Sequence, residues 1–276
     1  MASTNVLVRV QARGGKYLGP DIGYALVTLR NALSGQVLAQ GLATGGSGGF
    51  SKHYTPGASS QVIVTPPAPN AADAGRDKPH DTVTWLTAPQ GTAGLTATLD
   101  LEEPTLVEIT AQALTNGAPN GHQATQRTWL TPGADVAAEP GIVLVMPGLN
   151  VQVLSPSLSS PAAADLAVTA WVTMMCGCKI AEPTATNPSL WLPESFEVTA
   201  RVSQVGGPFE AEATLAYQAV STFGTPAGST IKLPGAGNYR LEINAVQAAE
   251  GNVGSATTFF SINPPPPMPL TPPRQV

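Results

Sequence analysis

The chain has 276 residues, of which 42% are hydrophobic and only 11% charged, and its formal net charge is −5. This length suits one large domain or two ordinary ones with real cores. The sequence has no cluster of basic residues and no apolar run of the roughly 18 residues that cross a bilayer, so we expect neither a nucleic-acid surface nor a membrane span.

Strict alternation of apolar and polar residues predicts strands with one buried face and one face in water, as in antiparallel sheets. The clearest examples are residues 5–12, 95–101, 196–203 and 239–245. In the first of them, Val6 and Val8 lie on the predicted buried face, and Arg9 and Gln11 lie on the wet face. With 28 glycines and 27 prolines to form turns, the pattern predicts an all-β protein of two antiparallel β-sandwich domains.

Three stretches interrupt the strand pattern and set the expected domain boundaries. Residues 65–93 are rich in Pro, Asp and Gly and are predicted to form a long insertion. Residues 155–165 have the composition of a linker, and residues 263–276 that of a polyproline II tail. The first sandwich is therefore expected over residues 1–154 and the second over residues 166–262.

Residues 23–50 carry a family resemblance. A strand enters a turn with Gly35, a second strand follows, and the segment then continues through Gly41, Thr44, Gly49 and Phe50. This order resembles the carboxypeptidase-regulatory, or transthyretin-like, β-sandwich. The resemblance implies a transthyretin-like first domain that serves as a scaffold and brings no catalytic residues.

Residues 166–262 contain the motif Tyr-x-Leu-x-Ile-x-Ala from Tyr239, followed by a Gly-Asn-x-Gly turn and a closing strand. This half resembles a bacterial immunoglobulin-like domain, in which Tyr239 would be a corner tyrosine. The two halves together resemble exported bacterial proteins that carry a Met-Cys-Gly-Cys motif at the start of the second sandwich.

The stretch WVTMMCGCKI concentrates the sulfur of this chain, with both of its cysteines and two of its five methionines at Met174, Met175, Cys176 and Cys178. On an extended strand, Met174, Cys176 and Cys178 would point the same way. Two thiolates and a thioether form a site for Cu(I), whereas structural zinc requires four ligands. Two alternatives stay open: a disulfide that needs Gly177 to bend the chain, and ordinary packing in a core.

The remaining candidate residues do not indicate an enzyme. His53, His80 and His122 lie in Gly/Pro-rich surroundings and could reach a metal only through folding or a partner chain. The acids flanking His80 are more typical of a solvated loop than of a general base. The stretch GGSGG around Ser47 lies in no predicted strand-to-helix turn of the kind that a Gly-x-Ser-x-Gly elbow requires, and it lacks the Lys and the helix of a phosphate loop.

The composition favours an exported protein, extracellular, on the cell surface or periplasmic, whose export signal has been removed. We expect a non-enzymatic structural or adhesive protein that works through self-association or contacts with other envelope proteins. Residues 2–10 or the tail are candidate donors of an exchanged segment. The alternative is an envelope Cu(I)-binding protein that uses the Met-Met-Cys-Gly-Cys motif.

Overall fold

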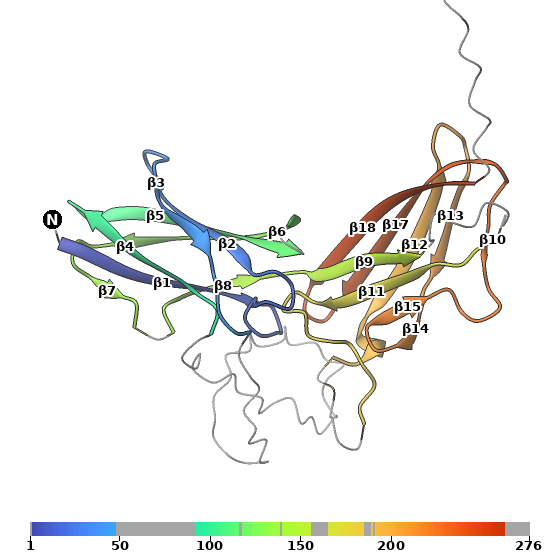
Figure 1. Cartoon of the computed structure of the whole chain (residues 1–276), viewed down its shortest axis with the longest axis horizontal. Coiled ribbons are helices and arrows are strands. Elements are labelled where there is room, and N and C mark those ends of the chain that lie inside the picture. Colours follow the sequence, from blue (N-terminus) through green and yellow to red (C-terminus); the bar gives the residue numbers. More distant parts are fainter. Residues whose placement is uncertain are drawn as a thin grey trace, which may run out of the picture. The chain divides into compact units, whose positions relative to one another are not determined.

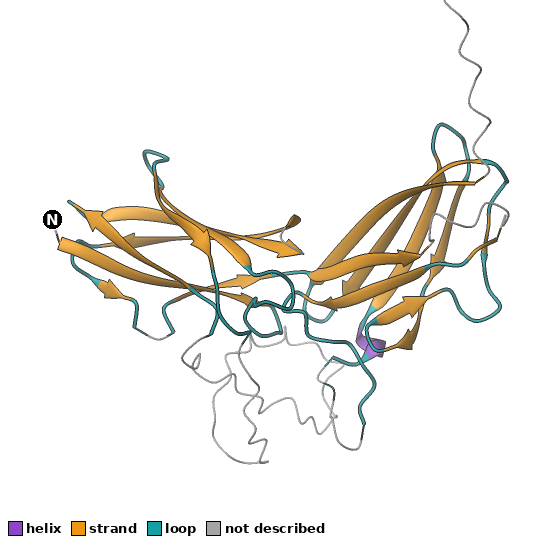
Figure 2. Ribbon diagram, in the orientation of Figure 1, coloured by secondary structure: helices purple, strands orange, loops and turns teal. Residues whose placement is uncertain are grey.

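The computed structural model describes residues 2–47, 92–115, 118–138, 140–155, 165–184, 189 and 191–262 (Figure 1). Nearly all of the predicted insertion and linker, and the whole predicted tail, lie outside these residues. The described chain consists of strands and turns with a short 3₁₀ helix, η3, at Pro193–Ser195 (Figure 2). The prediction of an all-β protein is confirmed. No helix in the described part of the chain is long and apolar enough to span a membrane.

The chain divides into two compact units that are not consecutive in sequence. Unit 1 comprises Met1–Asn150, Thr173–Ser195 and Val246–Gly254, and unit 2 comprises Val151–Val172, Phe196–Ala245 and Ser255–Val276. The division differs from the two successive domains expected from the sequence. Two segments of the expected second domain belong to unit 1, and one of them carries the sulfur motif.

Unit 1 contains two sheets. One has the order β4-β1-β7, with β8 also paired to β1, and the other has the order β3-β2-β5-β6. The strands of the first are β1 (Ala2–Ala12), β4 (Leu95–Leu101), β7 (Asp135–Val136) and β8 (Ile142–Met146). Those of the second are β2 (Ala25–Asn31), β3 (Val37–Leu42), β5 (Thr105–Thr115) and β6 (Ala118–Leu130).

Strand β1 is central in its sheet, antiparallel to β4 and parallel to β7 and β8. The expected wet face of this strand is wrong, because Arg9 is 3% exposed and Gln11 is 7% exposed. The Arg9 guanidinium donates to the carbonyl of Thr92 and, at 3.1 Å, to that of Ala93. These bonds give the Nη1 of this buried cation two acceptors. The alternation in the sequence therefore marks two buried faces rather than one at this end of β1.

Unit 2 is built mainly from antiparallel strands in the orders β14-β15-β11-β9, β13-β12-β17-β18 and β10-β16. Their bounds are β9 (Leu149–Ser155), β10 (Asp165–Leu166), β11 (Thr169–Met174), β12 (Glu197–Gln204), β13 (Glu210–Thr214), β14 (Ala216–Ala219), β15 (Thr222–Gly224), β16 (Ile231–Lys232), β17 (Gly237–Gln247) and β18 (Asn252–Ile262). The predicted strands at 196–203 and 239–245 correspond to β12 and β17.

Tyr239 on β17 behaves as the corner tyrosine that the immunoglobulin-like resemblance implies. Its side chain is fully buried, its hydroxyl donates to the carbonyl of Gly235 at 2.8 Å, and its ring stacks on Phe260 with centroids 5.4 Å apart. A hydroxyl bonded a few residues upstream is the arrangement found in such sandwiches. The buried polar tip and the buried ring therefore both have partners.

Candidate functional site

The sulfur motif forms a hairpin turn, which we call the sulfur hairpin (residues 174–178). Strand β11 ends at Met174, whose N–H donates to the carbonyl of Cys178 at 3.0 Å. The N–H of Gly177 donates to the carbonyl of Met174 at 2.8 Å, and Gly177 has a φ of +76°. A turn that ends in a left-handed glycine is a common three-residue hairpin loop. The motif therefore does not run along an extended strand, and the chain bends at Gly177.

The tip of the sulfur hairpin is buried within unit 1. Met174, Met175 and Cys176 are fully buried, while Cys178 is partly exposed. The hairpin packs on the segment 14–22. There a methyl group added to Gly15 would lie 3.0 Å from Sγ of Cys176. A buried turn is unusual because turns normally lie at the surface, where water satisfies their backbone groups.

A neighbouring indole ties the same segments together. The Nε1–H of Trp191 donates to the carbonyl of Gly14 at 3.0 Å, and the Trp191 side chain is buried. The N–H of Gly15 in turn donates to the carbonyl of Ala12, at the end of β1. The residues around the sulfur hairpin are thus fixed to the central strand of unit 1.

The two cysteines are free thiols that hydrogen-bond to each other. Burial opposes ionisation of Cys176, but hydrogen bonds from Cys178 and from the Lys16 backbone, together with the Lys16 charge, lower the pKa of this thiol overall. The hydrogen bond with Cys176, burial and the negative charge of Cys176 raise the pKa of the Cys178 thiol. Cys176 is therefore the first of the two thiols to ionise, and a second thiolate beside it is disfavoured.

The four predicted sulfur ligands all lie in the sulfur hairpin, whereas His122, the histidine that the structure describes, lies on β6. His53 and His80 lie outside the described residues. Burial lowers the pKa of the His122 imidazole, and hydrogen bonds with the backbone of Leu149 and Pro147 offset part of this shift. In the described part of the chain no group of three or more His, Cys, Asp or Glu residues could hold a metal ion.

A second candidate site lies on the sheet β3-β2-β5-β6. One side of β5 contributes Val107, Ile109 and Ala111 to the core, and the alternate residues face away. A groove of about 470 Å³ lies on that other side. It is lined by Leu26, Thr28, Arg30, Gln40, Glu108, Thr110, Gln112, Gln123 and Thr125, which we call the polar face.

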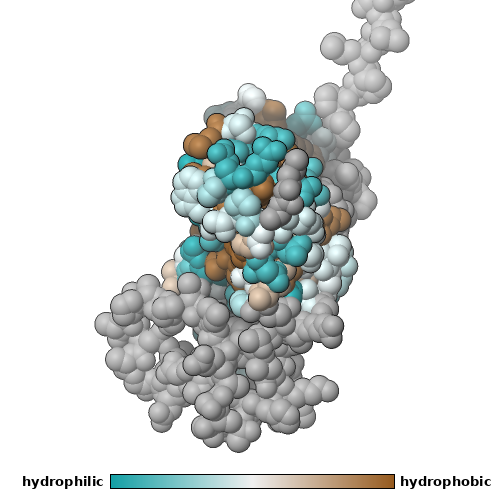
Figure 3. All heavy atoms as spheres, turned by 90° about the vertical axis from the view of Figure 1, so that its left-hand side faces the viewer, coloured by the Kyte–Doolittle hydropathy of each residue, from teal (hydrophilic) through white to brown (hydrophobic). Residues whose placement is uncertain are grey.

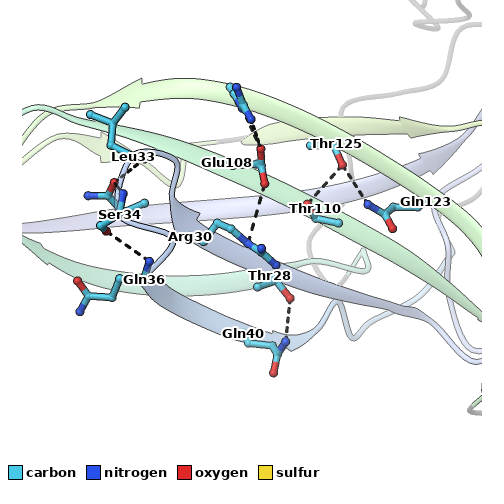
Figure 4. Close-up of polar contacts among 12 residues, drawn as sticks. Thr28, Arg30, Leu33, Ser34, Gln36, Gln40, Glu108, Thr110, Gln123 and Thr125 are labelled. Carbon is cyan, nitrogen blue, oxygen red and sulfur yellow. Dashed lines mark hydrogen bonds and ion pairs between the residues drawn. The ribbon is translucent and has the colours of Figure 1, made fainter.

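Hydrogen bonds and ion pairs link the polar face across its strands (Figure 4). The hydroxyls of Thr110 and Thr125 lie 3.3 Å apart. The Nη2 of Arg127 lies 2.7 Å from Oε2 of Glu108, and its Nε also donates to that oxygen, at 2.8 Å. On the other side of Glu108, the Nε of Arg30 lies 4.0 Å from Oε1. These contacts connect neighbouring strands of the sheet across the polar face.

Trp129 extends the polar face along β6. It pairs with Leu106 two positions beyond the pair Glu108–Arg127, so its side chain lies on the same side of the sheet. The ring is 61% exposed. In the view of Figure 3, the apolar residues of the described surface are scattered among hydrophilic ones. Sequence reasoning missed this site, although TLVEITAQALT alternates and its polar positions could have indicated it.

No family model and no curated protein matches the chain. Among solved structures, the chain is similar to the selenomethionine-substituted interferon gamma receptor alpha chain of chicken, at 10% sequence identity and a TM-score of 0.29. The similarity covers 95% of this chain and 98% of the receptor chain. Values this low give no indication of what the chain binds.

Proposed function

We propose that this chain is a non-enzymatic exported or cell-surface protein of adhesive character, and that the polar face is its contact surface. The observation that carries the proposal is a groove whose polar side chains bond to one another across strands, beside an exposed indole. Adhesion through a sheet face requires a rigid scaffold, which agrees with the resemblance of residues 23–50 to a transthyretin-like module.

The chemistry of the polar face fits a hydroxyl-rich polymer, a polysaccharide. Threonine hydroxyls and glutamine amides both donate and accept hydrogen bonds, as sugar hydroxyls do. An exposed Trp129 offers a flat apolar surface to the C–H face of a sugar ring, at little cost in conformational entropy. A few fixed polar groups beside an apolar contact orient a ligand in most binding sites.

Exchange of the first strand fits this structure less well. Strand β1 pairs with β4 on one side and with β7 and β8 on the other, and its residues 6–12 are buried. A segment with both edges occupied is not free to join another subunit. Deletion of residues 2–12 is therefore expected to unfold unit 1 rather than to release an assembled partner. The tail, the other candidate donor, lies outside the described residues.

Gel electrophoresis through soluble polysaccharide tests the proposal, with dextran, hydroxyethyl cellulose and alginate as probes. We expect at least one polymer to retard the parent chain, and Trp129→Ala to abolish the retardation. Phe259→Ala is the matched control, because Phe259 is also 61% exposed but lies in unit 2. Retardation by none of the three polymers, or equal loss in both variants, would refute binding through the polar face.

A further inference from the structure

We infer that the sulfur hairpin is a Cu(I) site in which Cys176 and Cys178 are the main ligands and Met174 is the third. This inference stands apart from the proposed function, because it concerns a different part of unit 1. It deepens the copper interpretation of the motif by assigning a role to each residue.

The hairpin geometry brings the three sulfur side chains to one place. Met174 and Cys178 face each other across the turn, since the N–H of Met174 donates to the carbonyl of Cys178. Opposed residues of an antiparallel pair project to the same side. The hydrogen bond between the thiols then places Cys176 against Cys178. A strand would have spaced these sulfurs along its length, whereas the turn converges them.

The ligand set selects a soft monovalent ion. Thiolate and thioether sulfur suit Cu(I), which accepts few ligands, whereas structural zinc requires four from Cys, His or carboxylate. Among the described residues no third His, Cys, Asp or Glu joins the two cysteines. Binding of one Cu(I) by the two thiols releases two protons and leaves a complex of net charge −1.

The surroundings of the hairpin suit that negative charge and allow the ion to enter. The positive charge of Lys16 acts on both sulfurs, and the Lys16 backbone hydrogen-bonds to both. Cys176 is fully buried, but Cys178 is partly exposed and gives an ion a path from solvent.

A Cu(I) titration of the reduced, full-length protein against a chromogenic chelator, without oxygen, tests the inference. We expect one Cu(I) per chain. Cys178→Ser should weaken binding by more than the roughly 10–100-fold that loss of an outer-shell partner costs. Met174→Leu should weaken binding by about 10-fold, since only the weak thioether ligand is lost. Circular dichroism of each variant establishes that the fold is retained.

Met146→Leu is the matched control, because Met146 is also fully buried in unit 1 but lies on β8. Its affinity for Cu(I) should equal that of the parent. Equal weakening of Cu(I) binding by Met146→Leu and Met174→Leu would overturn the assignment of Met174 as the third ligand. Binding that persists in a folded Cys176→Ser/Cys178→Ser variant, or no binding by the folded parent, would overturn the site.

Discussion

Two turns of unit 1 share a left-handed glycine with the same φ and differ in their surroundings. In the turn between β2 and β3, Gly35 has a φ of +76° and its N–H donates to the carbonyl of Asn31 at 2.8 Å. Gly177 in the sulfur hairpin has a φ of +76° as well, and its closing hydrogen bond has the same length. A methyl group on Gly35 would meet nothing within 4 Å, whereas one on Gly177 would lie 2.8 Å from Cβ of Asp21.

The difference shows that the local chain sets the turn and the tertiary contacts set its burial. Glycine adopts a left-handed φ without the steric cost that a Cβ brings, so either sequence can turn at that point. Leu33, two residues before Gly35, is 81% exposed, while Met175, two residues before Gly177, is fully buried. The sulfur hairpin is thus part of a core, and substitutions in it should act as core substitutions do.

The largest expected effect is that of Met175→Ala, which removes a fully buried side chain from the tip of the sulfur hairpin. Truncation of a buried methionine leaves a cavity and should lower the free energy of unfolding by about 3–4 kcal/mol. Leu33→Ala at the exposed turn should change it by less than about 0.5 kcal/mol. Urea unfolding measures both, and equal effects would mean that the two turns have similar surroundings.

Gly177→Ala should rank second. A left-handed alanine costs about 1–2 kcal/mol, and the overlap with Asp21 adds a repacking cost, giving a loss of about 2–3 kcal/mol. Gly35→Ala brings only the first cost, about 1 kcal/mol, because the space around it is open. The comparison between the turns fails if thermal unfolding gives these two variants the same stability.

Buried and exposed tryptophans should differ in the same way. Trp191→Phe removes the bond to the Gly14 carbonyl and some buried ring volume beside the segment on which the sulfur hairpin packs. Together these losses should cost about 1–2 kcal/mol. Trp129→Phe should leave the stability within about 0.5 kcal/mol of the parent, since that ring is exposed. A similar loss in both variants would mean that the indole bond contributes nothing.

The sequence predicted the strands that follow from local alternation, and it missed the burial that depends on neighbouring strands. Strands β12 and β17, and the role of Tyr239, follow from period-2 patterns and a corner motif. The alternation predicts that Arg9 faces water, but the side chain is buried. The pattern of one strand cannot show that other strands pair with both of its edges, or that both of its faces are covered.

The candidate site divides in the same way. Gly177 indicated that the chain could bend, yet nothing local showed that segment 14–22 would cover the turn. The four sulfur residues are close together in the sequence itself, whereas the contact between the thiols required the hairpin. The polar face needed the register of four strands, which brings Thr28, Thr110 and Thr125 into one row only after β2, β5 and β6 pair.

The smallest expected effect extends the contrast between buried and exposed surroundings to a titratable side chain, His122. Burial lowers the pKa of this imidazole below its ordinary 6.5, so the folded state binds its proton less readily than the unfolded chain does. The stability that the neutral ring contributes is therefore complete above pH 6.5 and is lost as the pH falls from there toward the folded-state pKa. Solvent screening of a half-buried ring keeps the loss to a fraction of a kcal/mol. The difference in unfolding free energy between pH 7.5 and pH 5 should be smaller in His122→Gln than in the parent, and an unchanged difference would mean that other groups account for the acid sensitivity.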